Sequence, residues 1–296
     1  MEILVTGGGG FLGQAIVRQL LARGDEVRIL NRGCYPELEA QGVRSFVGDI
    51  ADLDVVMEAS QGVDAIIHVA AKAGSGLHAP DFYQANVVGT NHVLAACRAH
   101  GIGYLVYTSS PSVVHAGGDI ENGNESLPYA THFHAPYPQT KAQAEAAVLE
   151  ANSASLKTVA LRPHLIWGPG DNHLLPRLIE KNNGRGIRLP APDKKIDTVY
   201  VDNAAEAHVL ALDALRTNAV AAGRAFFISN GEPLAISKMM AHLLQAAGHK
   251  PNIRRIPLKL AMGLATLIEG LWRLARRRTE PPLSRFVVEH LATAPQ

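Results

Sequence analysis

Short apolar runs alternate with longer helical patterns over the first two-thirds of the chain. The first helical pattern, FLGQAIVRQLLARG, repeats its apolar residues at helical spacing and ends at Gly24. The strand-like runs occupy residues 2–6, 26–30, 44–49, 64–71, 104–110 and 157–163. Continuous apolar strands separated by helices are typical of βαβ units, in which helices cover both faces of a parallel sheet. The pattern therefore predicts an α/β fold with a doubly wound parallel sheet.

The pattern changes after Ile166. Residues 167–172, WGPGDN, have the chemistry of a turn. Residues 197–215 have a strand pattern followed by a helical one, and we expect them to rejoin the main sheet. The chain beyond them mixes helices with one short strand, AFFIS. We therefore predict a first domain over residues 1–165 and a smaller C-terminal substrate lobe over residues 166–296.

A glycine-rich turn, TGGGGFLG, lies between the first strand and the first helix. In this context Gly7 permits a tight turn, Gly10 lets the backbone approach a pyrophosphate, and Gly13 lets the helix pack closely on the strand. The helix start, at Phe11 and Leu12, offers unpaired N–H groups and a partial positive charge to phosphates. The alternative is a glycine-rich turn without a ligand. We expect this first domain to bind a dinucleotide.

The end of the second strand bears on which dinucleotide binds. A site for NAD usually has an acidic residue here, which accepts hydrogen bonds from ribose hydroxyls, whereas this chain has Asn31 and Arg32. Arg32 can pair with a 2′-phosphate and Asn31 does not repel one, so we expect NADP(H) rather than NAD(H). The alternative is that Arg32 only caps a solvated strand end. Asp49, followed by Ile50, either meets the adenine amine or begins a helix.

Tyr137 and Lys141 form a YxxxK pattern at a run rich in Ala, Gln and Glu, which are good helix formers. Residues four apart on a helix are neighbours. A free tyrosine has a pKa of about 10 and is a poor proton shuttle at neutral pH, but a nearby ammonium lowers that pKa. We predict that Lys141 tunes Tyr137 to exchange a proton with a carbonyl or alcohol oxygen. The alternative is a surface pair, because YxxxK occurs by chance in many helices.

A candidate hydroxyl lies in YTSSPSVV, at the end of a strand. Ligands of open α/β sheets bind in the crevice outside the carboxyl ends of the strands. A hydroxyl there can hydrogen-bond a substrate oxygen and stabilise its developing charge. Ser109, Ser110 and Ser112 compete for this role. The alternative is that all three serve a turn, which Ser-Pro favours.

Six motifs occur in an order that resembles a known family. They are TGGGGFLG, HVAA, YTSSPSVV, APYPQTK, LRPHLIWGPGD and VYVDNAAEAH. Together they are similar to the extended short-chain dehydrogenases/reductases, and within them to the 3β-hydroxysteroid dehydrogenase-like branch. The resemblance runs from Met1 to about Leu291. It implies a Rossmann fold and an NAD(P)-dependent oxidoreductase that acts on CH–OH or ketone groups.

The same resemblance implies roles for individual residues. Ser110 matches the catalytic serine, Tyr137 the acid, and Lys141 the partner that also grips a ribose of the cofactor. Asn86 matches a helix asparagine that supports the site. The remaining residues that the resemblance places at the cofactor are Ala70, Ala71 and Lys72 in the cleft and Pro163 and His164 beside the nicotinamide amide.

The reaction that follows from this resemblance is NADPH-dependent reduction of a 2-alkyl-3-oxo acid to the 3-hydroxy acid. The same residues could instead oxidise a 3β-hydroxysteroid or sterol carboxylate, or epimerise a nucleotide sugar. A different class of function is a non-catalytic protein that senses dinucleotides, and the intact Ser-Tyr-Lys set disfavours it.

Composition limits the partners and the compartment. The chain of 296 residues is 47% apolar with a formal net charge of +1, so bulk charge gives no reason to expect nucleic acid. Cys34 and Cys97 lack CxxC spacing and are predicted to be reduced thiols. No signal peptide is visible, and we expect a cytoplasmic protein. His132 and His134 lack a neighbouring cluster of cysteines or carboxylates, so we expect no metal.

Residues 251–296 carry eight Arg or Lys against three Glu. Within them, residues 257–278 show a wide apolar face, and without ~20 charge-free apolar residues a transmembrane helix is not expected. The segment fits a helix docked on the core, a lid over a greasy substrate, or a peripheral contact with a membrane or a multienzyme complex. A homodimer is a further candidate assembly. The residues predicted to form the polar stripe of segment 257–278 are Lys259, Thr266, Glu269, Arg273 and Arg276.

Overall fold

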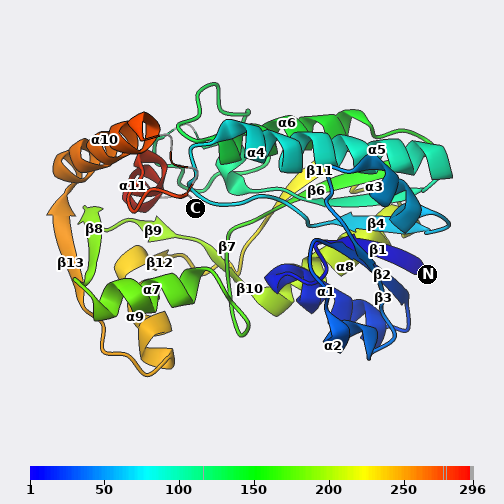
Figure 1. The fold of residues 1–296 in the computed structure, drawn as a ribbon, viewed down its shortest axis with the longest axis horizontal. Coiled ribbons are helices and arrows are strands. Elements are labelled where there is room, and N and C mark those ends of the chain that lie inside the picture. The colour runs from blue at the N-terminus through cyan, green and yellow to red at the C-terminus, as the bar shows by residue number, and fades with distance from the viewer. Residues whose placement is uncertain (116, 276, 278, 294–296) are drawn as a thin grey trace.

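The computed structural model describes residues 1–115, 117–275, 277 and 279–293, and its centre is a seven-stranded sheet (Figure 1). The strands follow the order β11-β6-β5-β4-β1-β2-β3, and every neighbouring pair is parallel. This order confirms the predicted doubly wound sheet. The strands are β1 (Glu2–Thr6), β2 (Glu26–Asn31), β3 (Arg44–Val47), β4 (Ala65–His68), β5 (Tyr104–Thr108), β6 (Lys157–Pro163) and β11 (Arg224–Ile228).

Helices cover both faces of this sheet because its strands are apolar on both sides. Ile3 and Val5 of β1 face one core, and Leu4 between them faces the other. The first face is covered by α1 (Phe11–Ala22) and α8 (Val201–Thr217), which pack on each other. The short α2 (Pro36–Glu39) lies near them. The helices of the second face are α3 (Leu53–Ser60), α5 (Gly89–His100) and α6 (Pro136–Glu150) (Figure 1).

Residues 197–215 return to the sheet by their helix and not by their strand. Strand β10 (Thr198–Tyr200) pairs with β7 (Leu165–Trp167) in a separate two-stranded sheet. Strand β10 therefore does not join the main sheet, and β11 occupies the place beside β6. Helix α8 meets the sheet because its buried residues, among them Ala204, Ala205 and Leu212, join the core under β1.

A smaller lobe lies at the side of the sheet away from the N-terminus (Figure 1). Its strands pair across long stretches of chain, β8 with β13 in parallel and β9 with β12 antiparallel. Two small apolar clusters form its core. Its elements are α7 (Leu174–Asn183), β8 (Ile187–Ala191), β9 (Lys195–Ile196), β12 (Leu234–Ala235), α9 (Ile236–Ala246), β13 (Ile253–Pro257), α10 (Leu258–Leu274) and α11 (Arg285–Ala292).

Candidate active site

The glycine turn between β1 and α1 leaves no space for side chains. Gly7 has a φ of +71°, which favours glycine. A Cβ on Gly13 would lie 2.1 Å from the Gly7 carbonyl oxygen, and one on Gly10 would lie 3.2 Å from it. Gly10 precedes α1 without a side-chain cap, so the first amides, at Phe11 and Leu12, remain for an anion. These residues fit the pyrophosphate of a dinucleotide.

A side chain at the end of β2 supports this glycine turn. Asn31 is buried, and its Oδ1 accepts a hydrogen bond of 2.9 Å from the Gly9 amide. Its side chain therefore holds the glycine turn in place. It also occupies the position at which NAD sites usually have an acidic residue. Arg32 is exposed beside it. The ring of Tyr35, which sequence reasoning missed, lies against Gly9, where a Cβ would come within 2.2 Å of it.

The residues predicted to meet adenine lie at the carboxyl end of β3. Asp49 is exposed, and its Oδ1 accepts a hydrogen bond of 2.9 Å from the Ala51 amide. It is not the N-cap of α3, because Asp52 holds that position and accepts from the Asp54 amide. Ile50 is buried against Gly89. The Asp49 side chain is thus exposed, and one of its carboxylate oxygens already accepts a hydrogen bond within its own loop.

Buried polar side chains hold the segment that follows β4. Ala70 donates its amide to the Thr6 hydroxyl at 3.2 Å, while Ala71 and Lys72 are exposed. Asn86 accepts from the Lys72 amide at 2.7 Å and donates to the Lys72 carbonyl at 3.0 Å. Asn86 also donates to the Thr140 hydroxyl, which ties the segment after β4 to α6.

Asn86 lies in a π-helical turn, residues 84–88, which interrupts the helical segment between β4 and β5. The turn η1 (Gln84–Val88) separates α4 (Ala79–Tyr83) from α5. Such turns are frequent at functional sites because they re-aim side chains. Here the irregular turn carries the amide that joins the Lys72 backbone to α6.

Ser110 and Tyr137 meet at the carboxyl end of β5. Ser110 begins the 3₁₀ turn η2 (Pro111–Val113), and its Oγ lies 2.9 Å from the Ser112 Oγ. Tyr137 lies in the first turn of α6 and forms a hydrogen bond with Ser110, which lowers the tyrosine pKa. Ser109 points into the interior and is buried. Of the three serines, Ser110 is therefore the one that contacts the tyrosine.

The pKa of Tyr137 moves in the direction opposite to the predicted one. Burial raises it above its ordinary value, and the hydrogen bond with Ser110 offsets only part of that rise. Lys141 is buried, donates from Nζ to the Thr108 carbonyl at 2.5 Å, and lies 4.2 Å from the centre of the Tyr107 ring. Burial lowers the pKa of Lys141 to about 7, against a rise caused by Glu145. The phenol is consequently kept protonated at neutral pH.

A buried ion pair beneath Lys141 escaped sequence reasoning. Arg162 donates to both carboxylate oxygens of Glu145, at 2.6 Å from Nη2 and 3.0 Å from Nε, and Tyr129 donates to the same carboxylate at 2.9 Å. Neither charged side chain is appreciably exposed. The only signal was spacing, since Glu145 follows Lys141 by four residues on α6.

The ion pair also fixes the start of the segment predicted to hold the nicotinamide amide. Pro163 follows Arg162 at the end of β6. His164 comes next, is buried, and donates its amide to the Ile228 carbonyl at 2.9 Å. Burial lowers the pKa of the His164 ring. Pro163 and His164 therefore stand at the carboxyl edge of the sheet.

Residues 257–278 consist mostly of α10, which exposes a row of leucines. The five side chains are spaced alternately by four and three residues, so they share one side of the helix. Glu269 does not belong to the predicted polar stripe, because it is 2% exposed and accepts from Arg285 at 3.0 Å. Arg276 and Arg278 lie outside the described residues. The exposed leucines are Leu260, Leu264, Leu267, Leu271 and Leu274.

The described part of the chain holds no helix whose length and apolarity would let it cross a bilayer. Among the same residues, no group of three or more His, Cys, Asp or Glu side chains is arranged to hold a metal ion. Cys34 is exposed, Cys97 is buried, and both are free.

The site can be compared with known proteins. Residues 4–260 match the 3-beta hydroxysteroid dehydrogenase/isomerase family. The chain is 53% identical to the 2-alkyl-3-oxoalkanoate reductase of Stenotrophomonas maltophilia, over 99% of this chain and 90% of that protein. It is 45% identical to the protein of the same name from Shewanella oneidensis, over 97% of this chain and 77% of that one.

A solved structure shares the whole architecture. The UDP-glucose 4-epimerase of Thermus thermophilus in complex with NAD aligns with a TM-score of 0.71 and 27% sequence identity. The alignment covers 98% of this chain and 97% of the epimerase. The likeness therefore includes both the sheet and the smaller lobe.

Proposed function

The chain belongs to the 3-beta hydroxysteroid dehydrogenase/isomerase family, and on that premise we propose that it reduces a 2-alkyl-3-oxo acid to the 3-hydroxy acid with NADPH. As a member of this family it is an oxidoreductase with a dinucleotide cofactor. The observation that carries the choice of substrate is the 53% identity, over nearly the full chain, to a 2-alkyl-3-oxoalkanoate reductase.

Reduction of a ketone needs a proton donor at the carbonyl oxygen. Tyr137 suits this role because burial raises its pKa and so keeps the phenol protonated at neutral pH. Ser110, in contact with Tyr137, would hold the same oxygen by a hydrogen bond. The bound nicotinamide supplies the hydride that adds to the carbonyl carbon. The residues proposed to hold the cofactor are those of the glycine turn, the ends of β2, β3 and β4, and Pro163 and His164.

Lys141 has two proposed tasks. Its ammonium is buried against the Thr108 carbonyl and the Tyr107 ring, so it is held at one place on the floor of the cleft. With a pKa of about 7 it is poised to gain or lose charge near neutral pH. We propose that it stabilises the phenolate that Tyr137 becomes after giving up its proton, and that it contacts a ribose of the cofactor.

The preference for NADP(H) over NAD(H) remains a proposal. Its support is the absence of an acidic side chain at the end of β2 and the exposed guanidinium of Arg32 at that point. Asn31 uses its Oδ1 on the Gly9 amide and so presents no charge. Arg32→Asp should weaken NADPH binding by about 10-fold or more, because a charge-assisted contact to phosphate becomes a repulsion. Binding of NADH should change little.

The function is tested by following oxidation of NADPH with a panel of substrates. We expect turnover with a 2-alkyl-3-oxo acid and little with NADH. Oxidation of a 3β-hydroxysteroid with NAD, in place of this activity, would favour the steroid reaction that the family name suggests. Epimerisation of a UDP-sugar would favour the sugar reaction. Tight NADPH binding without turnover of any of them would favour a sensor.

We also propose that the leucine row of α10 rests on an anionic lipid surface. The same helix exposes Lys259 and Arg273, and its one acidic residue, Glu269, is buried and paired. Arg273 is paired with Glu269 at 3.8 Å, on the side of the helix away from the leucines. The exposed Lys259 and Arg277, before and after the leucine row, would instead complement anionic headgroups.

Sedimentation with vesicles that contain phosphatidylglycerol tests this surface. Leu267→Ser with Leu271→Ser should abolish binding, because both side chains are more than half exposed on α10. Leu210→Ser, at an equally exposed leucine on α8, is the control and should bind as the unmodified chain does. Unchanged vesicle binding in the double variant would refute the lipid surface. A dimer that the double variant dissociates would assign the row to a second copy.

A further inference from the structure

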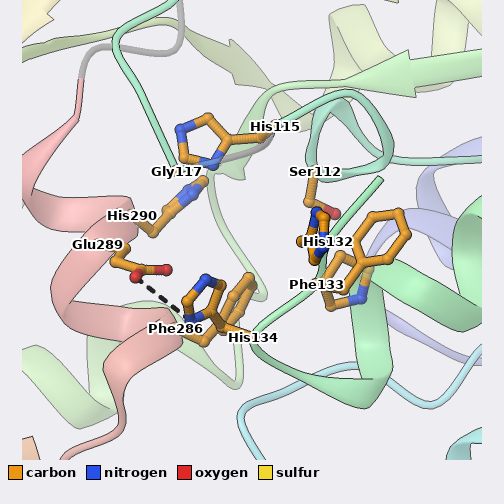
Figure 2. A pocket seen from close by; sticks show the side chains of 10 residues that line it. Ser112, His115, Gly117, His132, Phe133, His134, Phe286, Glu289 and His290 are labelled. Atoms are coloured by element: carbon orange, nitrogen blue, oxygen red, sulfur yellow. Dashed lines mark ion pairs between the residues drawn. The ribbon is translucent and has the colours of Figure 1, made fainter. Parts of the chain in front are cut away.

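A small pocket rich in histidine adjoins the proposed catalytic pair (Figure 2). Ser112, whose hydroxyl contacts that of Ser110, lines one side of it, and so does Pro138, which directly follows Tyr137. The loop after β5 and the C-terminal helix α11 form the rest of its wall (Figure 2). The pocket therefore opens where the part of a substrate next to its ketone would lie. The titratable residues that line it are His115, His132, His134, Glu289 and His290.

His290 is the member of this group whose hydrogen bonding is incomplete. Its Nδ1 is buried and, within the described chain, has no hydrogen-bond partner. Its ring stacks on Phe286, with centroids 6.0 Å apart, and meets the His115 ring edge-on at 6.3 Å. Packing thus fixes the ring while leaving a polar atom unsatisfied, which costs free energy unless a partner arrives.

The other polar groups of the pocket are already engaged. Nε2 of His115 lies 2.9 Å from the Thr293 hydroxyl, and His134 Nδ1 lies 3.4 Å from a carboxylate oxygen of Glu289 (Figure 2). Burial raises the pKa of Glu289, which favours its neutral form, while His134 and Arg285 oppose this rise. Burial and the neighbouring His115 and His164 lower the pKa of His290 to about 4. His290 is therefore neutral at pH 7 and can donate one ring N–H.

The chemistry of the proposed substrate supplies an acceptor for that N–H. In a 3-oxo acid only one carbon separates the ketone carbon from the carboxyl carbon. When the ketone oxygen lies between Ser110 and Tyr137, the carboxylate must lie immediately beside them. A metal ion is not an alternative occupant, because the described residues hold no cluster of side chains arranged for one.

We propose that this pocket is the subsite for the carboxylate of the substrate and that His290 donates a hydrogen bond to it. The inference rests on the proposed function, since it takes the ketone to be that of a 3-oxo acid. His115 shapes the site by holding the edge of the His290 ring. The C-terminal helix would thereby select acids over neutral ketones, a choice that the Ser-Tyr-Lys set cannot make because it contacts only the ketone oxygen.

The test compares one substrate with and without its charge. His290→Phe keeps an aromatic ring on Phe286 but removes both ring nitrogens. For a 2-alkyl-3-oxo acid we expect its kcat/KM to fall about 10- to 100-fold, as for loss of a hydrogen bond to a charged group. For the methyl ester of the same acid we expect a change of less than about twofold, because an ester has no charge for the donor to meet.

Two further variants separate binding from folding. His290→Asn places an amide donor near the position of Nδ1 and should recover part of the activity toward the acid. His242→Phe, at an exposed histidine of α9, is the matched control and should leave both activities unchanged. Thermal unfolding and NADPH binding of each variant report whether the fold and the cofactor site are retained.

The outcomes distinguish the inference from the function beneath it. Equal losses for acid and ester in His290→Phe, or an unchanged rate for the acid, would overturn the carboxylate subsite while leaving the reductase in place. If the unmodified protein reduced the ester but not the acid, the subsite would also be wrong. If it reduced neither, the proposed function itself would fail.

Discussion

The sheet and the smaller lobe use their apolar residues in different ways. In the sheet, β1, β2, β4 and β5 are buried on both faces, and the two large cores run from α1 and α8 on one side to α3, α5 and α6 on the other. The lobe has two much smaller clusters, and its helix α10 leaves five leucines exposed. The sheet and its helices thus bury their apolar side chains against one another, whereas the smaller lobe leaves apolar side chains of α10 exposed.

This difference matches the roles that we propose for the two regions. A rigid scaffold keeps catalytic groups at fixed distances, and Lys141 with the Glu145–Arg162 pair lies in such a setting. The lobe contributes the leucine row and, through α11, one wall of the histidine pocket, and we propose that both meet ligands. The division into a dinucleotide domain over residues 1–165 and a substrate lobe over residues 166–296 stays a prediction. Two elements of the later chain, α8 and β11, belong to the sheet and its core.

The largest expected effect concerns chemistry on the sheet side. Tyr137→Phe should lower kcat/KM for the 3-oxo acid about 10²- to 10⁴-fold, because the carbonyl oxygen loses its proton donor. NADPH binding, measured by fluorescence titration, should be retained. Tyr83→Phe, at an exposed tyrosine of α4, is the control. Turnover of Tyr137→Phe close to that of the unmodified enzyme would remove this residue from the role of donor.

The next effect compares a buried carboxylate in each region. Glu145→Gln should lower the free energy of unfolding by about 3–5 kcal/mol, because it leaves the buried Arg162 unpaired. Glu269→Gln in the lobe should cost less, because the side chain of its partner Arg285 is 30% exposed and water can take over. Urea unfolding of both variants measures the difference. Equal losses would contradict the contrast between the two regions.

A single methyl group should have opposite effects in the two regions. Gly13→Ala should cost about 1–3 kcal/mol of stability, because its Cβ would lie 2.1 Å from the Gly7 carbonyl oxygen. Gly263→Ala on α10 has open space for its Cβ and should stabilise the chain by about 0.5–1 kcal/mol, because alanine favours helix. Thermal unfolding reports both. A stabilised Gly13→Ala would show that the turn is looser than described.

A further expected effect is a slope of stability with pH. Burial lowers the pKa of His68 to about 3 and that of His208 to about 4 in the folded chain, from an ordinary value of 6.5. Below pH 6.5 the unfolded state therefore binds more protons, so stability falls as pH falls, by up to about 1.4 kcal/mol per pH unit for each histidine. His208→Gln should flatten this slope between pH 6.5 and 4. An unchanged slope would place the acid sensitivity elsewhere.

Most of the sheet could be predicted because local pattern and tertiary burial agree there. The strand predicted over residues 2–6 became β1, and that predicted over residues 157–163 became β6. The strand predicted at the start of residues 197–215 is present as β10, but it pairs with β7, a contact that no local pattern signals. Glu269 of α10 was predicted to lie in a solvated stripe, but it is buried and paired with Arg285, which belongs to the next helix, α11.

Sequence alone predicted the glycine turn, the alternation of strands and helices along the chain and, through the family resemblance, the candidate catalytic residues, because each is signalled by motifs of a few neighbouring residues. Only the tertiary structure decided that the pKa of Tyr137 is raised, that Glu145 and Arg162 form a buried pair, and that His290 and Ser112 line the same pocket. Burial and long-range contacts set these properties, since desolvation and hydrogen bonding depend on what the rest of the chain brings into the same space.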